Sequence, residues 1–261
     1  MSAATAFLLA GAACLLLQAA LWVVALRVRN WSLVDPGWAA CLVLTAGVYA
    51  AVLDGAPARR LALVAAVSLW GLRHVVLLLV HRVVGRPEEG RYVALRARWS
   101  AATFLGFFLA QGLLAALLSW PFLAVARHGG AGPAPLETAA LALFVVAWAG
   151  EAVADRQLAR WKADAGHRGR TCRAGLWAWS RHPNYFFEWL VWVAFALAAT
   201  AAPGGAWAWL AAATMLALLL FVTGIPPAEA QALRSRGDDY RAYQREVSAF
   251  VPWPPRRGDR A

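Results

Sequence analysis

The sequence predicts an all-α integral membrane protein with about seven transmembrane helices, and three observations lead to this prediction. First, 61% of the residues are hydrophobic and only 15% are charged, which exceeds the apolar share of soluble domains. Second, the apolar residues fall into runs of about 20, the length that crosses a bilayer as a helix. Third, Lys and Arg gather in alternate connections between these runs. The bilayer is therefore expected to solvate most of the surface.

Seven apolar segments are long enough to span a membrane. In chain order they are residues 4–26, 33–53, 61–80, 101–126, 136–154, 183–201 and 206–225. The first has no early Lys or Arg and is longer than the apolar core of a signal peptide, so it is expected to be a retained helix. Segment 183–201 has the weakest signal because its first turns carry His182, Asn184 and Glu188, as expected of a helix end that opens onto a cavity.

The basic residues predict the orientation. Of the 25 Lys and Arg, 21 lie in connections 27–32, 81–100 and 155–182 and in the tail 226–261. Arg73 lies within a span, and only Arg59, Arg60 and Arg127 lie on the opposite side. The positive-inside rule then places the N-terminus outside and the C-terminus in the cytoplasm, which also requires an odd number of spans. Because the net charge of +11 is spread between spans, we expect no nucleic-acid partner.

The three cysteines give no sign of a disulfide framework or a metal site. Cys14 and Cys41 fall inside apolar segments, and no CxxC or Cys/His ligand spacing occurs. We therefore expect inert buried thiols and no bound metal.

The densest polar region covers residues 151–188. If its first part is helical, Glu151 and Asp155 lie on one face. Gly166 and Gly169 then break a basic loop that leads into a helix starting near Pro183, a residue suited to a first turn. Free N–H groups and basic side chains in such a place suit phosphates, although contacts with lipid headgroups explain most of the basic residues equally well.

Polar groups at membrane depth occur in two other places. Asp35 stands at the head of an apolar segment, where it is either a helix cap or a functional carboxyl group. His74 lies within a span, where an interhelical hydrogen bond accounts for it. Arg82 and Arg86 follow at the expected cytoplasmic end and suit a phosphate.

Several motifs carry a family resemblance. They are GLWAWSRHPNYFFEW at 175–189 with the upstream D-x(6)-K and R-T-C-R, N-x-S-x-V-D-x-x-W at 30–38, L-W-G-L-R at 69–73, T-G-I-P at 223–226, D-Y-x-x-Y and F-V-P-W. Together they span nearly the whole chain. The sequence resembles steroid 5-alpha-reductases and, more specifically, their bacterial relatives in the group DUF1295.

The resemblance implies a seven-helix fold in which NADPH binds from the cytoplasmic side and an enone lipid, such as a 3-oxo-4-ene steroid, is reduced. The implied cofactor contacts are Arg82, Arg86, Glu151, Asp155, Lys162, Arg170, His182, Asn184, Tyr185 and Glu188. We expect the four basic residues to bind phosphates, Glu151 and Asp155 to position ribose or adenine, and Asn184 and Glu188 to hold the nicotinamide amide. The family's catalytic glutamate matches Asp35, whose carboxyl group in an apolar setting would donate a proton-bearing oxygen to the substrate carbonyl.

The chain departs from the steroid enzymes at several positions: Lys162 stands for an arginine, Glu151 for an asparagine and Asp35 for the glutamate. Leu79 stands where those enzymes have a substrate-polarising tyrosine, and Glu229 falls roughly where they have a cofactor-contacting histidine. Cofactor use is therefore expected to transfer better than steroid specificity. The sequence leaves the oligomeric state open, and a monomer is compatible with it.

Two other functions compete with the reductase. The RHPNY core and the Y-x-x-Y tail also occur in membrane methyltransferases that use S-adenosylmethionine, although basic and amide positions in two loops suit a dinucleotide better. A transporter or scaffold predicts polar residues along several spans, yet segments 101–126 and 206–225 have almost none. We expect one membrane domain over 1–261, with substrate-side helices in 1–100 and cofactor loops in 101–261. The Ala- and Arg-rich composition favours a bacterial inner membrane, with the cofactor site on the cytoplasmic side.

Overall fold

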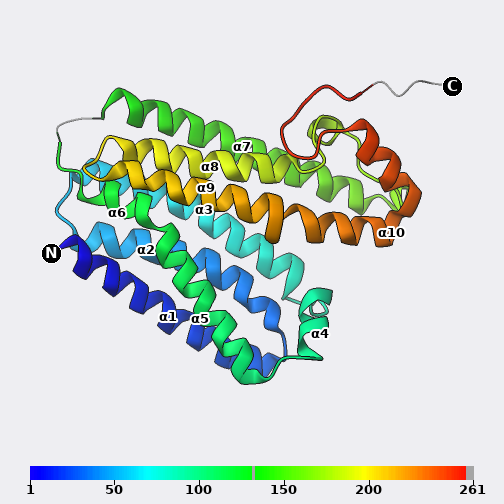
Figure 1. Ribbon diagram of the computed structural model, residues 1–261, viewed down its shortest axis with the longest axis horizontal. Coiled ribbons are helices and arrows are strands. Elements are labelled where there is room, and N and C mark those ends of the chain that lie inside the picture. The colour runs from blue at the N-terminus through cyan, green and yellow to red at the C-terminus, as the bar shows by residue number, and fades with distance from the viewer. Residues whose placement is uncertain (131–132, 257–261) are drawn as a thin grey trace. The chain divides into compact units, whose positions relative to one another are not determined.

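The computed structural model describes residues 1–130 and 133–256, and these residues form helices joined by loops and short helical turns (Figure 1). No β-strand occurs in these two ranges, where the only pairing of extended backbone is an isolated bridge between Ser180 and Ser248. Six helices are long and apolar enough to cross a membrane. They cover Ala3–Val28, Trp31–Val52, Pro57–Arg82, Ala101–Arg127, Pro135–Ala163 and Gly205–Glu246. The prediction of an all-helical integral membrane protein is therefore confirmed at this level.

The helices follow the seven predicted segments closely. They are α1 (Ala3–Val28), α2 (Val34–Val52), α3 (Pro57–Arg82), α4 (Gly90–Arg96), α5 (Ala101–Leu118), α6 (Trp120–Arg127), α7 (Pro135–Ala163), α8 (Pro183–Thr200), α9 (Trp209–Ala217) and α10 (Ile225–Glu246), with a π-helical turn at Leu218–Val222. Segment 183–201 corresponds to α8, which is not among the six candidate spans because its first turns are polar. Seven spans therefore stay a prediction.

Local sequence signals set several helix ends. The Ser2 and Ser100 hydroxyls accept hydrogen bonds of 3.1 Å from the backbone N–H groups of Thr5 and Thr103, as N-cap residues do. Pro57 occupies the first turn of α3, where its missing N–H costs nothing. Arg29 ends α1 in the left-handed conformation, with φ of 55°.

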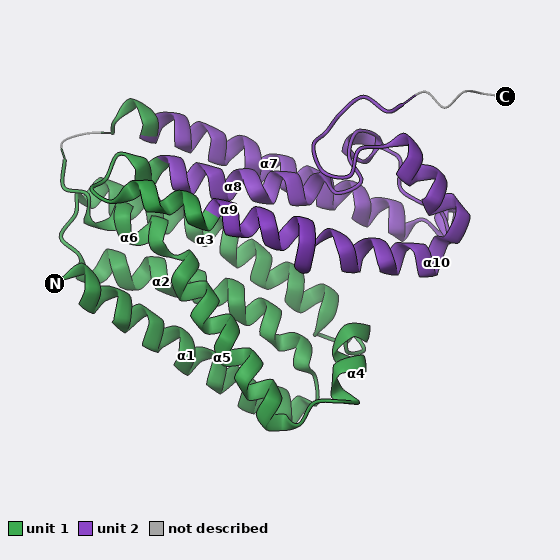
Figure 2. Ribbon diagram, viewed as in Figure 1, with its two compact units in different colours: residues 1–136, 198–211 green, residues 137–197, 212–261 purple. Residues whose placement is uncertain are grey.

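Contacts divide the chain into two compact units (Figure 2). Unit 1 comprises residues 1–136 and 198–211, and unit 2 comprises residues 137–197 and 212–261. The described part of unit 2 ends at residue 256, so Arg257 and Arg260, which contribute to the predicted cytoplasmic charge, lie outside the described residues. The expectation of one domain over 1–261, divided functionally near residue 100, stays a prediction.

Small residues allow close helix packing in unit 1. A Cβ atom added at Gly112 of α5 would lie 3.1 Å from the Cys14 carbonyl oxygen of α1. One added at Gly71 of α3 would lie 2.5 Å from Val43 Cγ2 of α2. Membrane helices often associate through such small residues, because backbones can then approach each other closely.

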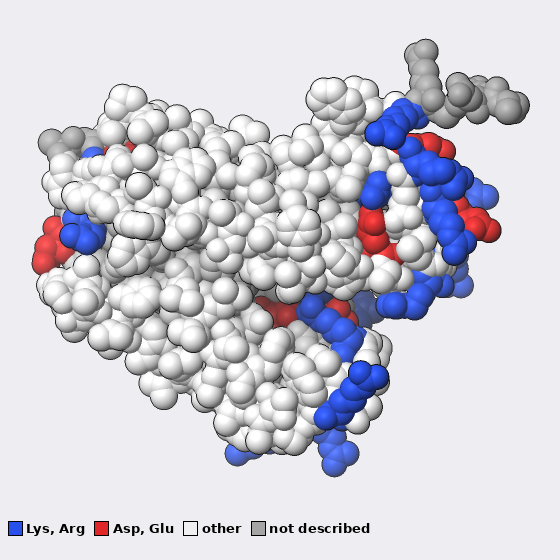
Figure 3. All heavy atoms as spheres, in the orientation of Figure 1, with Lys and Arg blue, Asp and Glu red and all other residues white. Residues whose placement is uncertain are grey.

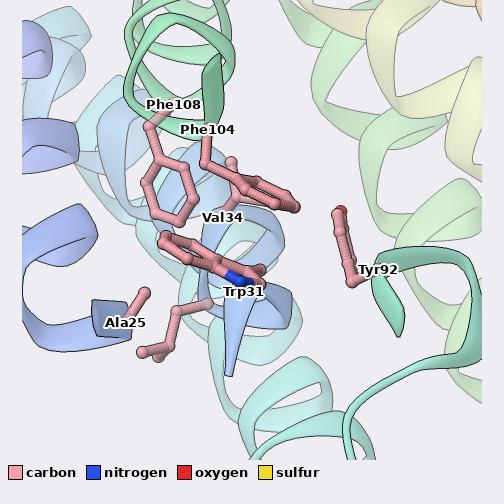
Figure 4. Packing of buried hydrophobic residues seen from close by; sticks show 7 residues of the cluster. Ala25, Trp31, Val34, Tyr92, Phe104 and Phe108 are labelled. Atoms are coloured by element: carbon pink, nitrogen blue, oxygen red, sulfur yellow. The ribbon is translucent and has the colours of Figure 1, made fainter. Parts of the chain in front are cut away.

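Aromatic side chains fix the turn between α1 and α2 (Figure 4). The Trp31 ring stacks on Phe104 of α5, with ring centroids 4.2 Å apart and planes within 1° of parallel. Phe108 meets Trp31 edge-on, and Tyr92 of α4 joins the same buried cluster. This packing holds the turn at residues 30–34 within unit 1 and positions Asp35, the next residue in the chain.

Unit 2 is organised around α7, α8 and α10. A Cβ atom at Gly150 would come within 2.6 Å of the Phe187 ring, so only glycine lets α7 and α8 approach this closely. Helix α10 bends sharply at Gly237, which has φ of 51° and ψ of −120°. Ala232, Tyr240, Tyr243 and Val247 then form a small core between its two halves.

Candidate functional site

The polar face predicted from 151–188 exists in unit 2, between α7 and α8. The predicted helix continues through Ala163, so Glu151 and Asp155 lie one turn apart on α7. The Asn184 Nδ2 atom donates a hydrogen bond of 3.4 Å to Asp155 Oδ1. The Asn184 Oδ1 atom is buried and has no hydrogen-bond partner among the described residues. This amide oxygen is therefore free to accept from a ligand.

Two acidic side chains lie deeper on the same pair of helices. Glu151 and Glu188 are 4% and 7% exposed, and carboxylate oxygens of the two residues lie within 4.8 Å of each other. The Trp192 indole donates a hydrogen bond of 2.9 Å to Glu188 Oε1. Two ionised carboxyl groups this close repel each other unless a proton or a positively charged group lies beside them. The expectation of no bound metal stays a prediction.

A basic loop follows α7, as the two glycines predicted. Gly169 adopts a positive φ of 73°, and Asp164 caps the first turn by accepting from the Gly166 N–H at 2.8 Å. Arg168 and Arg170 are exposed, and neither forms an ion pair within residues 1–130 and 133–256. Lys162 is also exposed at the end of α7. The loop therefore presents positive charge to solvent.

Contacts with the second half of α10 hold this loop in place. The Thr171 N–H donates a hydrogen bond of 2.7 Å to Asp239 Oδ2, and Arg173 forms an ion pair with Glu246. On the α7 side, Trp161 stacks on His167 with ring centroids 3.6 Å apart, and its indole N–H reaches the Arg170 carbonyl oxygen at 3.4 Å. The loop backbone is thus fixed while the side chains of Arg168 and Arg170 stay exposed.

A second group of contacts anchors the RHPNY segment at the start of α8. The Arg181 Nε atom donates to Glu229 Oε1 at 2.7 Å, and the same guanidinium donates to the carbonyl oxygens of Gln244 and Val247. Tyr240 and Gln244 also donate to Glu229, at 3.3 and 2.8 Å. Sequence reasoning missed Arg181 and this role of Glu229, because their partners are 48 residues apart in the chain.

His182 and Tyr185, both predicted to contact the cofactor, lie beside this anchor. Their rings are parallel within 4°, with centroids 5.3 Å apart. The His182 Nε2 atom lies 3.4 Å from Glu229 Oε1, and His182 is only 6% exposed. His182 therefore helps to fix the start of α8, and this contact leaves little of it for a ligand.

Unit 1 contains a separate charged cluster around Asp35. Asp35 Oδ2 pairs with Arg82 at 2.9 Å and with Arg91, while Asp35 Oδ1 accepts from the Tyr92 hydroxyl at 2.7 Å. Glu89 adds ion pairs of 3.0 Å to Arg82 and 3.3 Å to Arg91. A carboxylate with two guanidinium partners is a charged acceptor. This setting does not fit the predicted role of Asp35 as a proton donor in an apolar site.

Helix α4 is held against the motif at residues 30–38. The Trp31 N–H donates to Glu88 Oε1 at 2.7 Å, and the Glu89 N–H donates to Ser32 Oγ at 3.2 Å. Burial, together with the negative charge of Asp35, raises the pKa of Tyr92 well above its ordinary value. The Tyr92 hydroxyl is therefore a neutral donor throughout the physiological pH range, and sequence reasoning did not identify it.

The two arginines predicted to bind phosphate in this region differ in their surroundings. Arg82 is committed to Asp35 and Glu89, so it is not available to an anion in this arrangement. Arg86 is exposed in the connection before α4. Of the two, Arg86 is the better candidate for a phosphate contact.

Figure 3 shows Lys and Arg side chains gathered over α4 and over α10, with uncharged surface along the helices.

The helices and these charged clusters define an α-helical integral membrane protein with polar groups concentrated at helix ends. The chain belongs to the family described as "Protein of unknown function (DUF1295)", whose profile matches residues 21–247. The matched range includes Asp35, the basic loop, the RHPNY segment and Glu229. No curated protein and no solved structure matches the chain.

Proposed function

We propose that this protein is an NADPH-dependent membrane reductase of the steroid 5-alpha-reductase type, which transfers a hydride to the C=C bond of an enone lipid such as a 3-oxo-4-ene steroid. The observation that supports this most directly is the Asn184–Asp155 pair, because the resemblance assigns both residues to the cofactor and they are in hydrogen-bond contact. The proposal includes seven spans, an outer N-terminus, a bacterial inner membrane and a cytoplasmic cofactor site.

The residues of unit 2 fit a dinucleotide phosphate. The buried Asn184 Oδ1 atom has no partner among the described residues, and the N–H₂ group of a nicotinamide carboxamide is a donor that matches it. Lys162 and Arg170 are exposed cations at the end of α7 and in the loop after it, which suits phosphate groups. NADPH would supply the hydride when bound.

The chain's own residues would bind, orient and exclude water. In unit 2, Lys162 and Arg170 bind phosphate oxygens, Glu151 and Asp155 position ribose or adenine, and Asn184 and Glu188 hold the carboxamide. His182 and Tyr185 keep the first turn of α8 in place, with Arg181 and Glu229 behind them. Apolar helices around the site keep water away from the reacting carbon atoms.

Asp35 takes a different role from the one that the sequence suggested. Its carboxylate holds Arg82, Arg91 and the Tyr92 hydroxyl together, so it acts by positioning these groups. Tyr92 supplies a neutral hydroxyl donor near the position where the family's tyrosine is replaced by Leu79 in this chain.

Ligand-induced stabilisation tests the proposed cofactor. The protein, purified in detergent, is heated with excess NADPH, NADH or S-adenosylmethionine, and unfolding is followed by intrinsic tryptophan fluorescence. At 100 times Kd, a ligand that binds only the folded state stabilises it by about 2.7 kcal/mol. NADPH is expected to raise Tm, and Asn184→Ala and Arg170→Ala are each expected to weaken binding about tenfold.

Arg234→Ala is the matched control for Arg170→Ala, because Arg234 is an exposed arginine of α10 that bonds only to Gln231 among the described residues. This control should leave NADPH binding unchanged. Stabilisation by S-adenosylmethionine and not by NADPH would replace the reductase with a membrane methyltransferase. If Arg170→Ala and Arg234→Ala weaken NADPH binding equally, the loop contributes only through the general positive charge of the surface.

A further inference from the structure

Gln18 is an unusual residue for the middle of a membrane helix. It lies on α1, ten residues before Val28, the last residue of that helix, which places it roughly 15 Å from the helix end at about 1.5 Å per residue. A hydrocarbon core is about 30 Å thick, so Gln18 lies near its centre. The side chain is 0% exposed. Polar side chains at this depth are costly unless they have a function or a partner.

Neither polar atom of this amide is satisfied by the protein. Gln18 Nε2 and Gln18 Oε1 are both buried, and neither has a hydrogen-bond partner in the described parts of the chain. A buried amide without partners costs more than one that is bonded, typically about 1–3 kcal/mol by mutational data. A leucine of similar length would avoid this cost. The glutamine is therefore not explained by the packing of unit 1 alone.

Two glycines make room for the amide where three helices meet. A Cβ atom at Gly37 of α2 would lie 2.9 Å from Gln18 Oε1 and 3.2 Å from Gln18 Nε2. A Cβ atom at Gly112 of α5 would lie 3.2 Å from Gln18 Cγ. A Cβ atom at either position would therefore displace the Gln18 side chain from its present position. Gly37 follows Asp35 by two residues, which is about 200° of rotation, so the amide and the charged cluster lie on nearly opposite faces of α2.

We propose that the Gln18 amide binds the oxygen of an apolar ligand inside unit 1, and that this ligand carries a carbonyl or a hydroxyl group. An amide donates through Nε2 and accepts through Oε1, so it can serve either group. The neighbouring residues Cys14, Leu21, Gly37 and Gly112 are uncharged, which disfavours an ionic ligand. The proposal rests on the proposed function only in taking this ligand to be the enone lipid substrate.

The same amide suits the chemistry of enone reduction. When a hydride adds to the C=C bond, negative charge develops on the carbonyl oxygen, and a fixed neutral donor in a water-free site stabilises that charge. The Gln18 Nε2 atom is such a donor. Asp35 cannot take this role while its oxygens accept from Arg82, Arg91 and Tyr92. Gln18 is then the group that selects for a ligand oxygen.

The stability of Gln18→Leu without added ligand is the first test. If the amide is kept for a ligand, its removal is expected to raise Tm by about 2–4 °C, because an unsatisfied buried group is replaced by an apolar one. Gln111→Leu is the matched control. Gln111 lies on α5 next to Gly112, is only partly buried and is not among the unsatisfied buried groups. This control should not raise Tm. A lower Tm in Gln18→Leu would show that the amide joins helices and would overturn the proposal.

Ligand discrimination is the second test. The wild type and Gln18→Leu are titrated with a 3-oxo-4-ene steroid, the 3-hydroxy analogue and the 3-deoxy analogue, and the rise in Tm is compared. The wild type should bind an oxygenated steroid about tenfold more tightly than the deoxy compound, and Gln18→Leu should lose that preference. Tighter binding of the 3-oxo compound indicates a carbonyl ligand, and tighter binding of the 3-hydroxy compound indicates a hydroxyl ligand. Equal binding of all three by the wild type would overturn the proposal.

Gly37→Ala provides a second variant that keeps the amide. Its added methyl group would meet Gln18 Oε1 at 2.9 Å and Leu21 Cδ1 at 2.6 Å, so the amide must move and oxygen discrimination should fall. NADPH stabilisation is measured in parallel and should be unchanged in Gln18→Leu. If the wild type does not bind NADPH but still prefers the oxygenated steroids, the reductase proposal alone is refuted. If the wild type binds NADPH but does not discriminate among the steroids, the Gln18 site alone is refuted.

Discussion

Individual charged residues in this protein act through partners far away in the chain. Asp35 joins Arg82, Arg91 and Tyr92, and Glu229 joins Arg181 to Tyr240 and Gln244. Both carboxylates are partly buried, with side chains 19% and 16% exposed. At such sites a missing partner leaves a charge that water cannot fully solvate. Replacing one member of either cluster is therefore expected to disturb the contacts of the other members.

The Asp35→Asn variant tests this at the level of one residue. Asparagine keeps the size of the side chain and can still accept from Tyr92, but it removes the charge that holds Arg82 and Arg91. We expect a loss of about 1–3 kcal/mol in the free energy of unfolding, because the pairs are partly exposed. The measurement is Tm of the purified variant in detergent without added ligand.

Asp238→Asn is the control, since Asp238 pairs with Arg241 but its side chain is 96% exposed. That exposed pair should contribute less than about 1 kcal/mol. An Asp35→Asn variant as stable as wild type would contradict the clustered arrangement. Unchanged reductase turnover together with lower stability would show that Asp35 is structural only.

At the scale of elements, α10 is the clearest case of a helix shaped by one residue. It continues the helix that begins at Gly205, and its second half folds back after Gly237. The bend brings Tyr240 and Gln244 to Glu229, and it places Asp239 beside the basic loop at Thr171. One helix therefore anchors both the RHPNY segment and the loop that is proposed to bind phosphate.

Gly237→Ala is expected to destabilise unit 2. Gly237 has φ of 51° and ψ of −120°, a conformation in which a Cβ atom is strained. We expect a loss of about 1–3 kcal/mol and weaker NADPH binding, because the loop and Asn184 lose their support. Thermal unfolding with and without NADPH measures both effects.

Gly47→Ala is the matched control for this substitution. Gly47 lies in the interior of α2, has no positive φ, and a Cβ atom there would meet nothing within 4 Å. Alanine is expected to leave stability unchanged or to raise it by up to about 1 kcal/mol. If Gly237→Ala were equally harmless, the bend in α10 would not depend on the glycine.

At the scale of the whole molecule, the number of spans decides which side each terminus faces. Six candidate spans are established, and α8 would be the seventh. An odd number places the two termini on opposite sides, whereas an even number places them on the same side. The distribution of Lys and Arg favours the odd number, because all connections rich in these residues then face the cytoplasm.

Reporter fusions test this topology directly. With seven spans, green fluorescent protein fused after residue 256 should fluoresce, because it folds in the cytoplasm. Alkaline phosphatase fused after Gly130, between α6 and α7, should be active, because it requires the periplasm. An active phosphatase at residue 256 would contradict the cytoplasmic C-terminus. Reactivity of a cysteine introduced at Ser2 toward an impermeant thiol reagent then reports the side of the N-terminus.

The sequence by itself determined the class and the helices. Hydrophobic length is a local property, and a bilayer forces each apolar run to satisfy its own backbone hydrogen bonds, so each predicted segment is helical over most of its length, with breaks at Ser119 and at residues 223–224. The motifs likewise identified Asp155 and Asn184, which prove to be in contact. The family resemblance supplied this pair, because the connection between the two helices runs from residue 164 to residue 182 and local periodicity does not relate residues across it.

Only the tertiary structure decided which charged groups are paired. Arg82 and Arg86 look alike in the sequence, yet one is bound by Asp35 and Glu89 and the other is exposed. The roles of Glu229 and Tyr92, and the unsatisfied amide of Gln18, also depend on helices that are distant in the chain. Periodicity shows which face a side chain occupies, but its charge state and its partners depend on what the fold places opposite that face.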